Sequence, residues 1–451
     1  MSFTPATFAF YGDDFTGSSD SLDMLAAHGV PVTLIPERAI GSLGEVPAGT
    51  VVGIAGRSRS MSPDQMRAHL PSIFESLRDA GRTHLHYKVC STFDSAPGIG
   101  NIAVAARLAA ESLGSGPVWV LGGAPALGRY CVFGHLFARY GGDGHTYAID
   151  RHPVMSQHPV TPMTESDLRL HLGMLSPDLK VTGVDLMQLR DPAFGGTRAE
   201  SDASTNHADL IVFDALDVAD TDRFVAGLLD AGIAASPVMV GGSSIEDALG
   251  RVWRTDARPN TLKPTEQLLV LSGSCSPMST IQIEAAAAQH FAIVPVHTDL
   301  LVTDAYAERE RVLRDTLEAF RSHRHVLIHT CLGGGDPRIE RTKSATSNLG
   351  IDLGATSERI GRTLAQVLDA VLRVHQVPRV ALAGGDFAGN VVNALDIGAL
   401  DFSARVDPGV PLCVMRSSEP HLSGVEIALK GGQLGSERFY IKLRDGTGER
   451  A

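Results

Sequence analysis

The sequence predicts an α/β protein of two domains, each with a mostly parallel sheet flanked by helices. Short apolar segments alternate with segments of helical apolar spacing in both halves of the chain. Between the halves, residues 251–265 hold prolines and charges with little periodicity, which is typical of a linker. A chain of 451 residues also exceeds what one core usually supports. We therefore expect one domain at 1–250, a linker at 251–265 and a second domain at 266–451.

The first domain begins with an apolar strand at 8–11, a polar turn, and a helix at 18–29 that ends at Gly29. A strand at 30–35 follows, and the alternation then continues to residue 122. The expected strands are 50–55, 84–89, 118–122, 210–213 and 238–241, with helices at 65–80 and 102–112.

The second domain repeats this alternation. The expected strands are 267–272, 292–297, 325–330 and 379–383, and the helices are 278–290, 306–321, 356–375 and one opening at 390–395. The last fifty residues lose the helical period, and segments 405–414 and 425–429 resemble strands of a hairpin-rich end.

Charge, hydropathy and cysteine content exclude several classes of protein. The chain has 39 Lys and Arg against 51 Asp and Glu, a net charge of −12, so a nucleic-acid partner is not expected. No apolar stretch is long enough for a membrane span, and the N-terminus does not resemble a signal peptide. Five widely spaced cysteines indicate neither a disulfide framework nor a zinc site, so we expect a reduced cytoplasmic protein.

Polar residues gather at the ends of the predicted strands, where ligands of open α/β sheets bind. Asp13 and Asp14 stand in the first such turn and could bind hydroxyls, hold a metal or act as a base. Taken alone, the pair is equally compatible with a simple cap of the next helix. Its position in the first turn after a strand, and the doubling of the Asp, favour a functional role.

Three further strand ends of the first domain carry candidate ligand-binding residues. Arg59 offers a planar fork of donors suited to carboxylate or phosphate, although a surface arginine is the plainer alternative. The next turn combines a lysine, hydroxyl groups and a carboxylate, and the third combines an arginine and a histidine. These residues are Lys88, Ser91, Thr92, Asp94, Arg129 and His135, and together they suit a small hydroxylated anion.

The second domain is rich in glycine turns that follow apolar strands. Backbone N–H groups at such turns, together with a helix dipole, form anion sites suited to phosphates, although each glycine alone is weak evidence. The turns are 272–276, 333–338, 384–389 and 430–435. They spell neither GxxxxGK[ST] nor GxGxxG, so a nucleotide is only suggested. The spacing of His145, His152 and His158 matches no metal motif.

Ordered motifs across residues 8 to 440 resemble those of the four-carbon acid sugar kinases. In the first half these are Asp13–Gly17, Ser58–Ser60, Lys88 with Ser91 and Thr92, and an Ala-Pro…Gly-Arg…Gly-His stretch from Ala124 to His135. In the second half they are Gly273–Ser276, Gly384–Asp386, Pro408–Leu412 and Leu429–Gly432. The resemblance implies an N-terminal domain for the sugar acid, a C-terminal domain for ATP, and a cleft between them.

The implied reaction is phosphoryl transfer from ATP to a hydroxyl of a small four-carbon acid sugar. The acid would be of the tetronate or 3-oxo-tetronate type, or a divergent branched relative. Arg59, Lys88 and Arg129 would hold the acid's carboxylate, and Asp13 or Asp14 the reacting hydroxyl, one of them as base. Ser91, Thr92, Asp94 and His135 would complete this pocket. Mg²⁺ would neutralise phosphate charge, and the oligomeric state, including a homodimer, stays open. ATP would bind at Ser274, Ser276, Gly384, Gly385, Asp386, Gly389, Gly431 and Gly432.

Two departures from the family pattern bear on the substrate. Where the family reads Lys-x-Asp-Ser-Thr-x-Arg-Gly, this chain has Cys90 in place of the aspartate and Asp94 in place of the arginine. This exchange alters the charge of the pocket, so the acid can differ from the usual tetronate. The alternatives are a sugar-acid sensor without catalysis, favoured only by the altered Gly384–Gly389 turn, and an oxidoreductase or aldolase acting on a similar acid.

Overall fold

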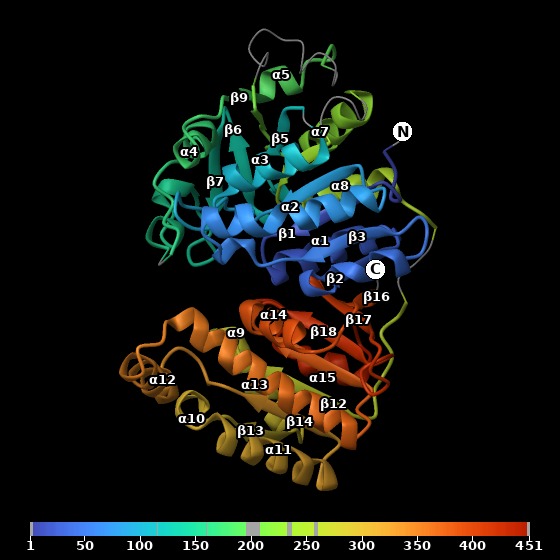
Figure 1. The fold of residues 1–451 in the computed structure, drawn as a ribbon, viewed down its shortest axis with the longest axis vertical. Helices are drawn as coiled ribbons and strands as arrows, with labels where there is room; N and C mark the ends of the chain where they lie inside the picture. Colours follow the sequence, from blue (N-terminus) through green and yellow to red (C-terminus); the bar gives the residue numbers. More distant parts are fainter. Residues whose placement is uncertain are drawn as a thin grey trace. The chain divides into compact units, whose positions relative to one another are not determined.

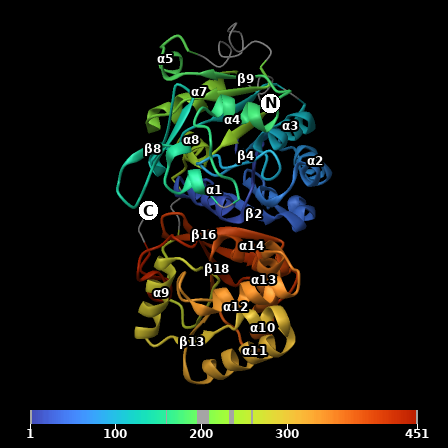
Figure 2. The same ribbon diagram turned by 90° about the vertical axis from the view of Figure 1, so that its left-hand side faces the viewer.

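The computed structural model describes residues 3–114, 116–158, 160–194, 208–231, 237–256 and 260–448. By contacts the chain divides into two compact units (Figures 1 and 2). Unit 1 consists of Met1–Val32 and Leu43–Ala257, and unit 2 of Thr33–Ser42 and Arg258–Ala451. This division falls inside the segment expected as a linker, of which residues 257–259 lie outside the described part.

Unit 1 is built on a parallel sheet with the strand order β9-β10-β5-β11-β4-β1-β3. Its strands are β1 (Phe8–Gly12), β3 (Val51–Ala55), β4 (His84–Lys88), β5 (Val118–Leu121), β9 (Val181–Val184), β10 (Leu210–Phe213) and β11 (Val238–Gly241). All residues of β1, β3, β4, β5, β10 and β11 are buried. Burial of this extent is expected where helices cover both faces of a parallel sheet.

The helices of unit 1 pack in neighbouring pairs, α1 with α8, α7 with α8, and α2 with α3. They are α1 (Phe15–Ala27), α2 (Pro63–Asp79), α3 (Ile102–Leu113), α4 (Leu168–Leu175), α5 (Leu186–Leu189), α7 (Val218–Ala231) and α8 (Ser244–Val252). Short 3-10 turns are η2 (Ser58–Ser60), η3 (Pro125–Leu127), η4 (Ile149–Arg151) and η5 (Met155–Gln157). A separate antiparallel sheet holds β6 (Arg129–Val132), β7 (His135–Arg139) and β8 (Thr146–Ala148).

Unit 2 has a mixed sheet in which β13-β14-β12-β15-β18 are parallel and β17, β16 and β2 continue antiparallel. The strands are β2 (Val32–Pro36), β12 (Leu268–Ser272), β13 (Ala292–Pro295), β14 (His325–His329), β15 (Arg379–Ala383), β16 (Ala399–Asp407), β17 (Val410–Arg416) and β18 (Glu426–Lys430). The helical elements are η1 (Glu37–Glu45), α9 (Pro277–Ala288), α10 (Thr298–Thr303), α11 (Ala305–Ser322), α12 (Pro337–Asn348), α13 (Leu353–Val374), α14 (Gly385–Ala394) and α15 (Phe439–Asp445). Among the described residues no helix has the length and apolarity of a membrane span.

The segment Thr33–Ser42 belongs to unit 2, although the sequence-based boundary assigns it to the first domain. The strand expected at 30–35 is present as β2, but it pairs antiparallel with β16, with Leu34 opposite Leu400. The Thr33 hydroxyl donates to the Asp401 carboxylate at 2.6 Å, which fixes the register. The sequence places this segment in the other domain because an apolar strand pattern indicates that a strand is buried in a sheet, but does not indicate which sheet contains it.

Candidate active site

The carboxyl end of β1 carries two adjacent carboxylates with different structural tasks. Asp13 follows β1 directly and is only 4% exposed. Asp14 is the N-cap of α1, and its Oδ1 accepts a hydrogen bond from the Gly17 N–H at 2.6 Å. Asp14 therefore caps α1, which is one of the two roles that the sequence suggests for the pair. Capping does not explain why Asp13 is buried. Since β1 pairs with β3 and β4, the turns after all three strands meet at this edge.

Arg59, in the turn after β3, joins both carboxylates. Its Nε and Nη2 donate to the two oxygens of Asp13 at 3.1 and 2.8 Å, and Nη1 donates to Asp14 Oδ2 at 2.6 Å. The backbone N–H of Arg59 also donates to the Asp13 carbonyl at 3.0 Å. The Arg59 side chain is 29% exposed, and a guanidinium has five N–H groups. Three of them bind these carboxylates, so with respect to the described residues two donors remain for an external ligand.

The electrostatics of this pair differ from those of a surface ion pair. Burial raises the pKa of Asp13 to about 6; Arg59 opposes the shift and Asp14 adds to it. Burial lowers the pKa of Arg59, but Asp13 and Asp14 outweigh it, so the net shift is well upward. The site thus combines a permanently charged cation with a carboxyl that can exchange a proton near neutral pH.

Lys88 ends β4 and lies beside the same carboxylates. It is 3% exposed, and its Nζ donates to the Val89 carbonyl at 2.9 Å. A Cβ added to Gly17 would lie 3.0 Å from this Nζ, so glycine allows the first turn of α1 to approach the lysine. Burial raises the pKa of Asp20 on α1, and the charge of Lys88 opposes that shift. We call Asp13, Asp14, Arg59 and Lys88 the Arg59 cluster.

The turn after β4 places the two residues that depart from the family pattern next to this cluster. The Thr92 hydroxyl donates to Asp94 Oδ1 at 2.5 Å, and the Thr161 hydroxyl lies 3.3 Å from Asp94 Oδ2. Burial, followed by the charge of Asp94, raises the pKa of Cys90. After Asp13 and Asp14, Cys90 and Asp94 also contribute to the raised pKa of Arg59, so both act on the same guanidinium.

The remaining sugar-pocket candidates are distributed differently. Ser91 contacts the turn after β11, where a Cβ on Gly242 would lie 3.3 Å from the Ser91 Cβ. Arg129 and His135 stand on the antiparallel sheet, where Arg129 donates to the Leu127 carbonyl at 2.5 Å and His135 Nδ1 lies 3.1 Å from Ser166 Oγ. Within the described residues neither forms a hydrogen bond or ion pair with the Arg59 cluster.

In unit 2, three turns after neighbouring strands form a second site. The turn after β12 leads into α9, whose N-cap Ser276 accepts from the Ser279 N–H at 3.1 Å and precedes Pro277 at the first helical position. Ser276 and Ser279 both donate to the Gly432 carbonyl, at 2.6 and 3.1 Å. The Ser274 hydroxyl accepts from the Ser276 N–H at 3.2 Å, which ties the turn together.

The turn after β15 requires glycine. Gly384 has φ of 113°, and its N–H donates to the Lys430 carbonyl at 2.9 Å. A Cβ there would lie 3.3 Å from backbone atoms of Gly273 and Ser274. Gly385 and Asp386 then open α14, and Gly389 is buried inside that helix. The predicted ATP-binding residues of the turns after β12 and β15 thus lie in direct contact.

Lys430 is the last residue of β18 and begins the third turn. It is not one of the residues predicted to bind ATP. Its Nζ donates to the carbonyls of Gly431, Gly432 and Leu434 at 3.0, 3.1 and 3.1 Å. The residue is 2% exposed, and burial lowers its pKa to about 8. A Cβ on Gly432 would lie 2.7 Å from Ser274 Oγ, so this turn abuts the one after β12. We call Gly273–Ser276, Gly384–Asp386 and Lys430–Gly432 the three-loop cluster.

The three-loop cluster fits a phosphate-bearing ligand. It combines the N-terminal ends of α9 and α14, closely apposed glycine backbones, and the hydroxyls of Ser274 and Ser276, all groups that bind phosphate oxygens. Among the described residues, no group of three or more His, Cys, Asp or Glu side chains could hold a metal ion.

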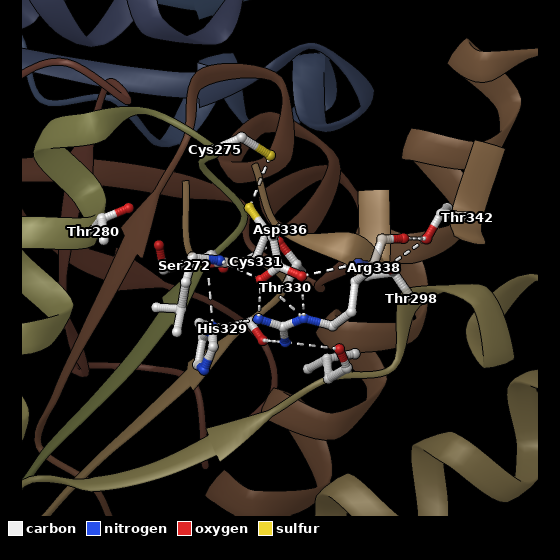
Figure 3. Close-up of polar contacts among 12 residues, drawn as sticks. Ser272, Cys275, Thr280, Thr298, His329, Thr330, Cys331, Asp336, Arg338 and Thr342 are labelled. Atoms are coloured by element: carbon white, nitrogen blue, oxygen red, sulfur yellow. Dashed lines mark hydrogen bonds and ion pairs between the residues drawn. The ribbon is translucent and has the colours of Figure 1, made fainter. Parts of the chain in front are cut away.

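Two further pairs of polar side chains are not among the predicted site residues. Asp336 caps α12 and accepts from the Arg338 side chain at 2.6 Å and from the Leu332 N–H at 2.7 Å, which holds its pKa far below the usual range (Figure 3). In unit 1 the buried His86 and Glu246 lie 2.5 Å apart. Asp336 and Arg338 lie in the predicted glycine turn 333–338, whereas no motif marks His86 and Glu246, which are 160 residues apart in the sequence.

Comparison with known proteins assigns a family to both units. A model of a sugar-binding N-terminal domain matches residues 8–249, and one of a nucleotide-binding C-terminal domain matches residues 269–440. The chain belongs to the four-carbon acid sugar kinase family. The resemblance noted from the sequence is thus confirmed, and the Arg59 cluster and the three-loop cluster fall in different family domains.

The family's curated members extend over the whole chain. A 3-oxo-isoapionate kinase of Paraburkholderia graminis is 36% identical, with 97% of this chain and 94% of the relative covered. A 3-oxo-tetronate kinase of Pseudomonas fluorescens is 30% identical, with 95% and 94% covered. A crystal structure described as a putative tRNA synthase from Salmonella typhimurium shares the fold, with a TM-score of 0.74, 23% identity, and coverage of 96% and 98%.

Proposed function

We propose that this kinase transfers the terminal phosphoryl group of ATP to a hydroxyl of a 3-oxo sugar acid, with 3-oxo-isoapionate ahead of 3-oxo-tetronate. The kinase activity on a small acid sugar follows from the family and its curated members. The choice between the two acids rests on the higher identity to the 3-oxo-isoapionate kinase and on Cys90 and Asp94, which depart from the family pattern.

The observation that carries the proposal is the Arg59 clamp on Asp13 and Asp14. It lies in the part of the chain that matches the sugar-binding domain, and it leaves two guanidinium donors for a carboxylate. A buried carboxyl beside it, with a pKa of about 6, has the proton affinity of a general base near neutral pH. An anion-binding cation and a base next to each other suit a hydroxylated acid.

In the proposed reaction each residue of the Arg59 cluster has one task. The free N–H groups of Arg59 orient the acid through its carboxylate, and Asp13 accepts the proton of the attacking hydroxyl. Asp14 keeps the first turn of α1 in place through the Gly17 N–H. Lys88 supplies positive charge close to Asp13, which offsets part of the negative charge gathered there. Phosphoryl transfer requires positioning and charge neutralisation more than covalent catalysis.

The three-loop cluster is the proposed ATP site. Backbone N–H groups of Ser274, Cys275 and Gly385 would donate to phosphate oxygens, and the hydroxyl of Ser274 would add to them. Ser276 would position this turn through its hydrogen bond to the Gly432 carbonyl. Lys430 holds the third turn through three carbonyls. Mg²⁺ would neutralise phosphate charge when bound, with Asp386 in the first turn of α14 as a candidate ligand.

The test is ADP release by the purified chain with ATP, Mg²⁺ and either 3-oxo-isoapionate or 3-oxo-tetronate. We expect turnover of both, with the higher kcat/KM for 3-oxo-isoapionate. Asp64→Asn is a suitable control, because this carboxylate is on the surface, 94% exposed, and pairs with Arg67 at 2.8 Å. ATP-dependent thermal stabilisation without turnover of any 3-oxo acid would contradict the substrate assignment. Binding of a sugar acid without any ATP consumption would favour a sensor instead.

A further inference from the structure

We propose that Cys275 and Cys331 are a reversible dithiol–disulfide pair that controls the proposed ATP site of unit 2. The two Sγ atoms lie 2.8 Å apart, with the Cys331 thiol donating toward Cys275 (Figure 3). The structure contains both as free thiols. A disulfide needs sulfurs about 2.05 Å apart, so a movement of roughly 0.8 Å closes the bond.

The fold brings the two thiols together from neighbouring parallel strands. Ser272 of β12 is opposite His329 of β14, and Thr330 donates its N–H to the Ser272 carbonyl at 3.0 Å. Each cysteine follows the end of its own strand, so the pairing of the strands sets the distance between the sulfurs. The contact therefore follows from the sheet register and does not depend on a surface side chain folding back.

The environments of the two sulfurs suit different roles in thiol oxidation. Cys275 is exposed, and the hydrogen bond from Cys331 lowers its pKa to about 7, so a large part of it is thiolate at neutral pH. Cys331 is 2% exposed, and that same hydrogen bond, followed by burial, raises its pKa well above the ordinary value. An accessible thiolate beside a protected second thiol is typical of redox-sensitive pairs.

A hydroperoxide is the oxidant class that such a thiolate meets. The Cys275 thiolate attacks one oxygen of hydrogen peroxide, the O–O bond breaks, and hydroxide leaves, which gives a sulfenic acid. Cys331 then attacks that sulfur; its proton and the departing hydroxyl group leave as water, and the S–S bond forms. Two thiols and one peroxide thus give one disulfide and two waters. A dithiol reductant reverses the change by thiol–disulfide exchange.

Cys275 must move, because Cys331 is held from several sides. The Cys331 carbonyl accepts from His329 Nδ1 at 3.1 Å, and Asp336 anchors the following turn through Leu332 and Arg338 (Figure 3). Cys275, by contrast, stands between Ser274 and Ser276 in the three-loop cluster. The Cys331 Sγ also lies 3.5 Å from the Ser274 carbonyl oxygen, so the two turns already touch at this point.

The consequence for ATP rests on the proposed function. Drawing Cys275 toward β14 turns the peptide groups of residues 274–276, and the N–H groups of Ser274 and Cys275 are proposed phosphate donors. Misdirecting one donor to a charged oxygen weakens ATP binding by roughly tenfold. Oxidation therefore lowers the affinity for ATP, and reduction restores it.

The experiment exposes the reduced full-length protein to hydrogen peroxide and follows two readouts. Peptide mass spectrometry should find Cys275 linked to Cys331 with the loss of two hydrogens, while Cys90, Cys131 and Cys413 stay reduced. Titration with ATP alone should show the roughly tenfold loss of affinity, reversed by dithiothreitol. Cys331→Ser keeps a donor at this position and should retain ATP binding before and after peroxide.

The possible results test the disulfide, its effect on ATP binding and the ATP site separately. If peroxide adds oxygen to Cys275 of the wild type without forming a disulfide to Cys331, the proposed dithiol–disulfide pair is wrong. In that case Cys275→Ala should only abolish the addition of oxygen. A disulfide that leaves ATP affinity unchanged overturns the control of the site. If neither the reduced nor the oxidised protein binds ATP, the proposed ATP site fails, and the disulfide still decides whether the pair exists.

Discussion

Asp13 and Arg59 are joined twice, once between side chains and once between backbones. Two guanidinium nitrogens bind the two carboxylate oxygens, and the Arg59 N–H donates to the Asp13 carbonyl. The backbone bond fixes the turn after β3 against the turn after β1, so the ion pair keeps its geometry without help from a ligand. Such preorganisation lowers the cost of orienting a substrate between them.

Arg59→Lys should separate this geometry from simple positive charge. A lysine keeps the charge but cannot bind both oxygens of Asp13 and also reach Asp14. We expect kcat/KM for the sugar acid to fall by roughly 10- to 100-fold, the loss of one or two charge-assisted hydrogen bonds. Steady-state kinetics with each 3-oxo acid measures the change, and the affinity for ATP serves as the internal control. Unchanged kinetics for both acids would remove Arg59 from the substrate site.

The raised pKa of Asp13 predicts how activity depends on pH. A base must be ionised, so kcat/KM should rise with pH and level off above about 6. Asp13→Asn should lower kcat by roughly 10²- to 10⁴-fold, the usual contribution of a general base, and should remove this limb from the residual activity. If kcat/KM of Asp13→Asn rises with pH in the same way as that of the wild type, a group other than Asp13 causes the pH dependence.

The raised pKa of Asp13 also makes the free energy of unfolding depend on pH. The pKa of Asp13 rises from 3.8 to about 6 on folding, so between these values the folded chain binds more protons than the unfolded chain. The free energy of unfolding therefore falls as pH rises through this window. Melting curves of wild type and Asp13→Asn between pH 4 and 7 should show this contribution in wild type alone.

Cys90 and Asp94 should set the preference between the two acids. Both act on the guanidinium of Arg59, and Asp94 is fixed by Thr92 and Thr161. The double variant Cys90→Asp, Asp94→Arg restores the family pattern, so the ratio of kcat/KM should shift toward 3-oxo-tetronate by roughly tenfold. Asp94→Arg alone places a second cation next to Arg59 and should impair both acids. Equal ratios in wild type and the double variant would exclude these positions from specificity.

Much of the fold could be predicted from the sequence, because both units alternate buried strands and helices in short, local patterns. The buried runs of β1 and β12 and the polar turns after them were recognisable. The pairing of β2 with β16 was not, because a strand's partner depends on tertiary contacts. For the same reason the sequence indicated Arg59 as a ligand for an external anion, but not its bonds to Asp13 and Asp14. Lys430 stood within a recognised motif, yet only the structure shows its three carbonyl partners.

Gly384→Ala should test the three-loop cluster. Gly384 has φ of 113°, which strains any L residue, and an added Cβ would meet the backbone of Gly273 and Ser274 at 3.3 Å. The strain costs about 1–3 kcal/mol, and displacement of the turn after β12 should weaken ATP binding by roughly tenfold. Gly350→Ala is the matched control, because Gly350 has φ of 63° but no atom within 4 Å of the added Cβ. Both variants should lose thermal stability, whereas calorimetric titration should show weaker ATP binding only for Gly384→Ala. Equal affinities in the two variants would place the nucleotide elsewhere in the chain.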